Sequence, residues 1–340
     1  MASVISAQPP GNPVPLDPLA ERVVALYPPV VAGARWSALG SAGGFSGARI
    51  WRGVTAEGRE YCLKVHPPAA DADRLERVIH RWMTTARAAG LDFVPAVERG
   101  RDGRTVVEAG GRVWDVMSWM PGRADFHQDP SDARLFAAVS TLARLHEAWA
   151  GDGGVAPCPA IVRRRQALLE WEDLLGRGWQ PRFDAGDPVR PHAEAAWRVL
   201  PSVLPEVRPP LMHWVKEPVP VQPCLCDVWH DHVLFDGDRV TGVIDHAAAK
   251  VDHVAVDLGR LLGSFIPDDA DRTEAALNAY RALRPLPQPD LVSLLDRTGV
   301  VIGVTNWVRW LYHDGRIYPN REAVAGRLAE LVQRLERMSR

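Results

Sequence analysis

The stretch from residue 223 to 246, PCLCDVWHDHVLFDGDRVTGVIDH, decides the fold of this chain. Two short apolar runs flank Asp236–Arg239, and the Asp-Gly pair in that segment is typical of a tight turn. The pattern therefore predicts a β-hairpin. Asp227 and Asp245 come near the outer ends of its two strands, and a hairpin brings such positions close together.

Two carboxylates placed in this way suit a metal-assisted phosphoryl transfer. One carboxylate can orient the hydroxyl group of an acceptor, and the other can hold a divalent cation on the phosphates. Either aspartate alone could equally cap the end of a hairpin, as turn carboxylates commonly do. The hypothesis of catalysis therefore depends on Asp227 and Asp245 together and on the rest of the chain.

The same stretch resembles the catalytic loop of the aminoglycoside phosphotransferase and choline kinase-like family, small-molecule kinases with a protein-kinase-like fold. That loop reads His-Gly-Asp, followed after a hairpin by Ile-Asp and later by an Asp-Leu pair. The chain matches its Asp at Asp227, the spacing to Ile244-Asp245 and the pair Asp257-Leu258, with Asp252 where the family often has Gly-Asp. The resemblance spans about residues 34 to 265.

The N-terminal third of the chain predicts a small α+β lobe. Residues 34–65 read as strand, glycine-rich turn, strand, turn and strand, which is typical of an antiparallel meander. Residues 71–89 carry apolar side chains at helical spacing and are followed by Gly90, so they predict an amphipathic helix with a glycine stop. Further strands are expected at 94–99 and at 105–108 with 113–117.

Helical patterns dominate after residue 122. Helices are expected at 132–149, 161–175, 192–200, 272–283, 289–316 and 321–338. The proline-rich segments 201–210 and 218–223 are expected to separate helices from the catalytic hairpin.

The fold class expected from these elements is α+β, a protein-kinase-like fold of two lobes. The expected parts are a disordered lead-in at 1–16, a nucleotide-binding N-lobe at 17–118, and a mostly helical C-lobe at 119–340 that carries the catalytic hairpin and binds the acceptor.

The resemblance implies a set of residues around a bound nucleotide. Lys64 would bind the α- and β-phosphates, and Glu76 on the following helix would pair with it. A different register of that helix would instead bring His80 near the lysine, and Lys64 could also be an ordinary surface lysine. The loop over the nucleotide and the hinge beside it would include Gly43, Gly44, Gly47, Trp119 and Met120. A plain hairpin turn is the alternative for the glycine loop.

The catalytic loop departs from the family pattern at three positions. Asp227 would be the catalytic base and Asp245 the principal metal ligand, but Leu225 and Cys226 stand where His-Gly is usual. His232 stands where the family has a metal-binding Asn. Imidazole is a poor ligand for Mg²⁺ and a reasonable one for Mn²⁺ or Zn²⁺, so the second metal site is either altered, with His232 as a ligand, or lost.

The resemblance implies an ATP-dependent kinase that transfers the γ-phosphoryl group to a hydroxyl of a small molecule with Mg²⁺, or with Mn²⁺ if His232 is a ligand. The departures motivate the alternative of a pseudokinase, a nucleotide- or metabolite-binding module whose catalysis has decayed.

Two further patterns lie in or near the same region. Cys224-x-Cys226 with His230-x-His232 could bind zinc, although this spacing is tighter than that of zinc fingers and strand cysteines commonly serve as small packing residues. Trp307 could line an acceptor pocket together with Trp310, or it could pack between helices.

The composition narrows the choice of partner. The 340 residues carry a formal charge of −2, and 37 of their 40 basic residues are arginines. Near-neutral charge argues against a nucleic-acid partner. The sequence has no apolar run of the length that spans a membrane, its N-terminus does not read as a signal peptide, and its four cysteines do not make a disulfide framework, so we expect a cytoplasmic protein. The three lysines, Lys64, Lys216 and Lys250, are expected to face the active-site cleft.

Overall fold

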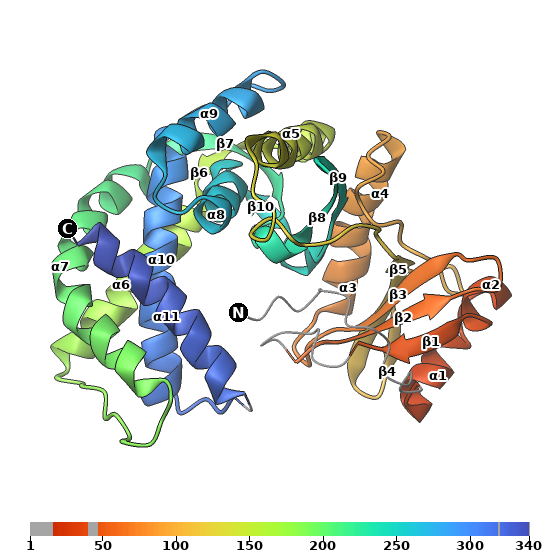
Figure 1. The fold of residues 1–340 in the computed structure, drawn as a ribbon, viewed down its shortest axis with the longest axis horizontal. Coiled ribbons are helices and arrows are strands. Elements are labelled where there is room, and N and C mark those ends of the chain that lie inside the picture. The colour runs from red at the N-terminus through yellow and green to blue at the C-terminus, as the bar shows by residue number, and fades with distance from the viewer. Residues whose placement is uncertain (1–15, 40–46, 319, 340) are drawn as a thin grey trace. The chain divides into compact units, whose positions relative to one another are not determined.

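The structure is a computed structural model that describes residues 16–39, 47–318 and 320–339. Its backbone contacts divide them into two compact units, whose elements are labelled in Figure 1. The sheet unit contains the described residues up to Trp149 together with Val228–Ala249. The helical unit contains Ala150–Asp227 and residues 250–339. These units are defined by contacts within the backbone and do not coincide with the two lobes expected from the sequence. A lobe boundary between residues 118 and 119 therefore stays a prediction.

An antiparallel sheet of five strands is the base of the sheet unit. In hydrogen-bonding order the strands are β1 (Arg35–Ala38), β2 (Arg49–Val54), β3 (Glu60–Val65), β5 (Arg112–Ser118) and β4 (Val107–Ala109). Lys64 lies on the central strand, paired with Ile50 on one side and Asp115 on the other. The predicted meander is present, whereas the strand expected at 94–99 is reduced to a single bridge between Val97 and Met117.

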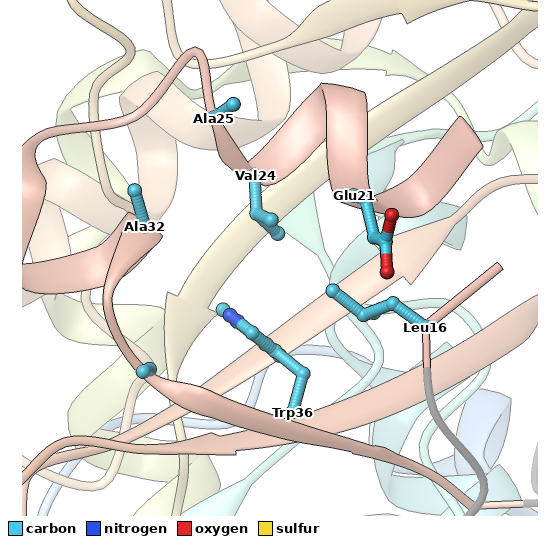
Figure 2. Close-up of a pocket in the computed structure, with 7 residues that line it drawn as sticks. Leu16, Glu21, Val24, Ala25, Ala32 and Trp36 are labelled. Carbon is cyan, nitrogen blue, oxygen red and sulfur yellow. The ribbon is translucent and has the colours of Figure 1, made fainter. Parts of the chain in front are cut away.

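Helices α1 (Pro18–Val24) and α2 (Pro29–Ala32) cover an apolar cluster on the sheet that includes Trp51 and Trp114. Beside β1 these helices border a pocket of about 370 Å³, which Figure 2 shows in close-up. Its lining consists of Leu16, Glu21, Val24, Ala25, Ala32, Ala34 and Trp36. None of the site residues predicted from the sequence lines this pocket.

The helix predicted at 71–89 forms in three parts: α3 (Ala72–Arg74), the π-helical turn η2 (Leu75–Ile79) and α4 (His80–Ala88). The Asp71 carboxylate caps its start by accepting a hydrogen bond from the backbone N–H of Arg74 at 3.0 Å. Gly90, at φ +79°, follows its end. The π turn widens the helix, so residues after it no longer keep the register of a regular α-helix.

The predicted catalytic hairpin is present as β8 (Val233–Asp236) and β9 (Arg239–Val243). The short helix η4 (His230–His232) directly precedes β8 in the chain, and η5 (His246–Ala248) follows β9. Helix α5 (Asp132–Ala148) packs beside β9 (Figure 1). Met120 and Ala124 form an apolar cluster with Leu234, against which Ile244 packs. This cluster attaches the hairpin to the segment that follows β5, which explains why the hairpin belongs to the sheet unit.

The helical unit packs long helices around α10 (Asp290–Tyr312). Helix α10 contacts α6 (Pro159–Gly176), α7 (Arg190–Trp214), α8 (Ala255–Phe265) and α11 (Arg321–Met338) (Figure 1). The remaining elements are η3 (Ala150–Asp152), β6 (Gly154–Pro157), β7 (Pro218–Cys224), β10 (Lys250–Asp252) and α9 (Ala270–Arg281). Its small sheet has the order β10-β7-β6. Among the described residues, no helix is both long and apolar enough to cross a bilayer.

The proline-rich segments do not act as the separators that the sequence predicts. Helix α7 continues to Trp214 with four prolines inside it, and β7 begins at Pro218. An interior proline costs a helix about 3 kcal/mol. Here Val203, Val207 and Leu211 recur every four residues and are buried in the core of the helical unit, while Pro201, Pro205 and Pro209 stay exposed. Packing of the apolar face thus overrides the local preference.

Gly122 makes a specific test of how the hairpin is attached. Its φ is +99°, and a Cβ built there would lie 2.2 Å from Thr241 Oγ1 and 2.7 Å from the Phe235 carbonyl oxygen. We expect Gly122→Ala to lower the free energy of unfolding by about 2–4 kcal/mol, through backbone strain and overpacking together. The measurement is urea denaturation of the full chain.

Gly58→Ala is the matched control, because Gly58 has a φ of +79° but no atom within 4 Å of a built Cβ. It should cost only about 1 kcal/mol, the strain of a left-handed backbone. Equal losses for the two variants would contradict the close approach at Gly122.

Candidate active site

Lys64 and Asp245 meet at the centre of the sheet unit. The Lys64 ammonium nitrogen lies 2.8 Å from Asp245 Oδ1, although 181 residues separate the two in the sequence. The lysine side chain is 10% exposed and that of Asp245 42% exposed. Two residues predicted from the sequence to contact a nucleotide and its metal are therefore in direct contact.

The pair keeps both groups charged. Burial by itself would lower the pKa of Lys64, but the charge and hydrogen bond of Asp245 outweigh it, so the pKa is raised. Burial would raise the pKa of Asp245, and the Lys64 ammonium holds that pKa well below its usual range instead. At neutral pH an ammonium and a carboxylate thus face each other, and the carboxylate remains partly open to solvent.

The backbone around Asp245 is held from two sides. Asp245 has a left-handed conformation, φ +59° and ψ +65°, which ends the strand, and the Ile244 N–H donates to the His232 carbonyl at 2.9 Å. The Arg74 guanidinium donates to the carbonyl oxygens of Ala247 and Ala249. A non-glycine residue in this region of φ and ψ costs of the order of 1–3 kcal/mol and persists only where its surroundings determine it.

The chemistry of this site fits a hard divalent cation at Asp245. Its carboxylate supplies the oxygen ligands that Mg²⁺ and Mn²⁺ prefer. His232 Nε2 lies 3.9 Å from Asp245 Oδ2, but it also accepts a hydrogen bond from Trp229 Nε1 at 2.9 Å. The ring nitrogen nearest to Asp245 is thus already engaged, so His232 is the weaker of the two proposed ligands.

The structure does not bring Glu76 to Lys64. The Glu76 carboxylate accepts hydrogen bonds from the Thr105 N–H at 2.8 Å and from Arg104 Nε at 3.1 Å. Glu76 lies in the first part of the π turn, and its carboxylate is engaged with the segment before β4. The second register considered from the sequence is closer, because His80 contacts Asp115, the neighbour of Lys64 across the sheet.

The structure describes three of the five loop and hinge residues that the resemblance implies around a nucleotide. Gly43 and Gly44 lie outside the described residues. Gly47 has φ +74°, and its carbonyl accepts a hydrogen bond from Arg112 at 3.0 Å. The Trp119 N–H donates to the Glu60 carbonyl, while Met120 is buried against the hairpin. Contact of these residues with a nucleotide stays a prediction.

Asp227 belongs to the helical unit, where Arg260 is a partner. Arg260 Nη2 donates to Asp227 Oδ1 at 2.5 Å, and both side chains are more than a third exposed. Asp257 fixes the loop before Asp227, because its carboxylate accepts from the backbone N–H groups of Leu225 and Cys226 at 2.7 and 2.6 Å. The loop is thus held through its backbone, independently of which side chains replace His-Gly.

Cys226 adopts the conformation that a glycine would favour, with φ +64°. Its thiol lies 3.8 Å from the Lys250 carbonyl oxygen, and Cys224 is buried. Burial raises the pKa of both thiols well above the ordinary value. A bound zinc ion would itself lower these pKa values, so the zinc alternative stays a prediction.

The remaining candidates belong to the helical unit. Trp307 is 8% exposed in the core and stacks edge-on with Trp310 at 5.4 Å between ring centres, as expected for helix packing. Lys250 lies on β10 and Lys216 is exposed after α7. A common cleft for these lysines and Lys64 stays a prediction.

Two residues of these sites were missed from the sequence. Arg260 lies three residues after Asp257 on helix α8, and Asp115 is a charged residue in the apolar strand β5. A carboxylate among Val113, Trp114, Val116 and Met117 was a visible signal, because such residues are rarely buried without a partner.

Comparison with known proteins gives these sites a context. Residues 38–290 match the family described as "Phosphotransferase enzyme family". The chain is 29% identical over 238 residues to a homoserine kinase of Bradyrhizobium diazoefficiens, covering 64% of this chain and 63% of that protein. The chain spans less than two thirds of the length of this homoserine kinase and of two others that it matches.

Solved structures share the fold at low sequence identity. An aminoglycoside phosphotransferase from Alicyclobacillus acidocaldarius is 17% identical, with a TM-score of 0.58 over 96% of this chain and 95% of that chain. A choline/ethanolamine kinase family protein from Mesorhizobium loti is 18% identical, with a TM-score of 0.54 over 93% of each chain. The α+β, protein-kinase-like fold expected from the sequence is confirmed.

The Lys64–Asp245 pair predicts a pH dependence of stability. The folded-state pKa of Asp245 lies below its unfolded value of about 3.9, so stability from this carboxylate is present above that pH and is lost as pH falls. Between about pH 5 and pH 2 the wild-type chain should lose more unfolding free energy than Asp245→Asn does. The difference should be of the order of 1 kcal/mol, because a partly exposed pair is screened by solvent.

Urea denaturation at several pH values measures this difference. Glu57→Gln, at an exposed position of the turn between β2 and β3, is the control and should lose as much stability as the wild type. An Asp245→Asn variant with the wild-type pH slope would contradict the ion pair.

Cys226 offers a second test. Because its φ is positive, Cys226→Gly should unfold within about 1 kcal/mol of the wild type, whereas the β-branched Cys226→Val should cost about 2 kcal/mol or more. Chemical denaturation of both variants measures the difference. Equal costs would show that the left-handed conformation is not the constraint at this position.

Proposed function

Because the chain belongs to the phosphotransferase enzyme family, we propose that it is an ATP-dependent kinase that moves the γ-phosphoryl group to a hydroxyl of a small molecule. The observation that carries the proposal is the 2.8 Å contact between Lys64 and Asp245. A buried ammonium beside a partly exposed carboxylate is the arrangement that a phosphate chain with its metal requires.

Each residue has a proposed task in the transfer. Lys64 binds phosphate oxygens of ATP, and Asp245 holds the divalent cation, which when bound neutralises charge on the phosphates. Asp227 accepts the proton of the acceptor hydroxyl as its oxygen bonds to the γ-phosphorus. The bond between that phosphorus and the β–γ bridging oxygen breaks, ADP leaves, and the proton passes from Asp227 to solvent.

The pseudokinase alternative rests on Leu225, Cys226 and His232. Two observations favour an active enzyme over it. The loop before Asp227 is held by Asp257 through backbone N–H groups, and Cys226 keeps a left-handed backbone where the family has glycine. Neither feature depends on the side chains that differ from the family pattern.

The acceptor is proposed from the names of the relatives. Several similar proteins are called homoserine kinase, so small hydroxyl-bearing amino acids, with homoserine first, are the compounds to test before aminoglycosides and choline. We also propose that the reaction takes place in the cytoplasm, where ATP is available.

Asp227→Asn tests the proposed base. Removal of a general base should lower phosphotransfer by about 10²- to 10⁴-fold, while ATP affinity stays within about twofold of the wild type. Production of ADP and of the phosphorylated acceptor, measured with Mg²⁺ and separately with Mn²⁺, gives the first quantity, and calorimetric titration with an ATP analogue gives the second.

Asp238→Asn is the matched control, because Asp238 is an exposed aspartate in the turn of the same hairpin. Its turnover should equal that of the wild type. Full activity in Asp227→Asn would reject the assigned base. Binding of ATP by the wild-type chain without turnover of any acceptor in a broad hydroxyl library would favour the pseudokinase.

A further inference from the structure

A buried acidic centre lies next to Lys64 in the sheet unit, formed by Asp115 and two histidines. Asp115 is completely buried, and its Oδ2 atom lies 2.8 Å from His66 Nε2 and 3.2 Å from His80 Nε2. The second ring nitrogen of His80, Nδ1, lies 2.8 Å from Thr105 Oγ1. The carboxylate is therefore held from the end of β3 and from the start of α4.

The two histidines keep Asp115 ionised. Burial by itself would raise the pKa of this carboxyl, but His66 and His80 outweigh burial and hold the pKa well below its usual range. The other oxygen, Oδ1, is buried and has no hydrogen-bond partner within the described part of the chain. A buried carboxylate oxygen with unused acceptor capacity is costly and calls for an explanation.

The register of the sheet directs Asp115 toward Lys64. Asp115 on β5 is the direct partner of Lys64 on β3, and side chains directly opposite each other in an antiparallel pair point to the same face. Its negative charge is one of the causes that raise the pKa of Lys64, after the charge and hydrogen bond of Asp245.

Glu76 does not pair with the Lys64 ammonium. The helix carboxylate that the resemblance implies as the partner of Lys64 is occupied by Arg104 and the Thr105 N–H. What the helix supplies instead is His80, which contacts Asp115. A second carboxylate beside the buried Lys64 ammonium would hold it in place when Asp245 turns toward a cation, so that the ammonium is already positioned for the phosphate oxygens.

We propose that Asp115 is a positioning residue for Lys64, and that His80 links the helix to it in place of a helix carboxylate. Asp115 Oδ1 then holds the ammonium in place for the phosphate oxygens while Asp245 binds the cation. This inference rests on the proposed function, because it concerns how the chain would bind ATP.

A double-mutant cycle on nucleotide affinity tests the proposal. The wild type, Lys64→Met, Asp115→Asn and the double variant are titrated with a fluorescent ATP analogue and Mg²⁺, which requires no turnover. Each single variant should bind about tenfold more weakly, and the double variant no more weakly than Lys64→Met, because Asp115 acts through the ammonium. Losses that multiply, or Asp115→Asn that binds like the wild type, would overturn the proposal.

Glu76→Gln in the same cycle is the matched control, because it neutralises the helix carboxylate that the resemblance implies as the partner of Lys64. Its effect, whatever its size, should multiply with that of Lys64→Met, because the Glu76 carboxylate does not contact the lysine. Coupling of Glu76 to Lys64 would restore the partner implied by the resemblance and reject Asp115.

His80 provides a second set of variants should Asp115→Asn fail to fold. His80→Asn keeps an amide near Thr105 but loses the contact with Asp115, whereas the longer His80→Gln can keep that contact. Weaker nucleotide binding is expected only for His80→Asn, and only when Lys64 is present. Equal binding by the two variants would overturn the link. If the wild type binds no nucleotide, the proposed function falls with this inference; binding without coupling rejects the inference alone.

Discussion

A buried ammonium must keep a counter-charge, and this constraint at Lys64 governs the sheet unit. The lysine lies on the central strand, where only carboxylates at close range can offset its loss of water. Asp245 contacts the Lys64 ammonium from the segment just after β9, where its backbone is left-handed and no longer follows the strand. Contacts of the hairpin with Met120 and Ala124, and of Arg74 with η5, hold that arrangement.

The helical unit meets a similar requirement with backbone contacts. Asp257 binds the two N–H groups before Asp227, and the buried Asp252 accepts from the N–H of Ala160 at the start of α6 and from Arg163. Because these carboxylates hold main-chain atoms, the side chains of the loop can change while its path is kept. The unusual Leu225-Cys226 pair thus lies on a backbone that Asp257 holds, with Cys226 in a left-handed conformation.

Local patterns were reliable where one short-range rule decided the structure. The hairpin, the meander and most helices follow from turn residues and from periods of 2 and 3.6. Prediction failed where packing opposed local preference. Helix α7 runs through its prolines because Val203 and Val207 bury one face, and the Glu76 carboxylate binds Arg104 and the Thr105 N–H instead of Lys64. No count of prolines or helical periods in the sequence contains that information.

The resemblance carried by the sequence already indicated the family and the fold class, and it singled out Lys64 and Asp245, which lie in contact in the structure; the motifs that carry it are local stretches of strand and hairpin. Only the tertiary structure decided which other charge faces the lysine. That choice depends on the register between β3 and β5, which are about 50 residues apart, and on the π turn that brings in His80. Both are outcomes of packing, because a one-residue shift of the strands would place a different side chain opposite Lys64, and a shift of the helix would place a different side chain against Asp115.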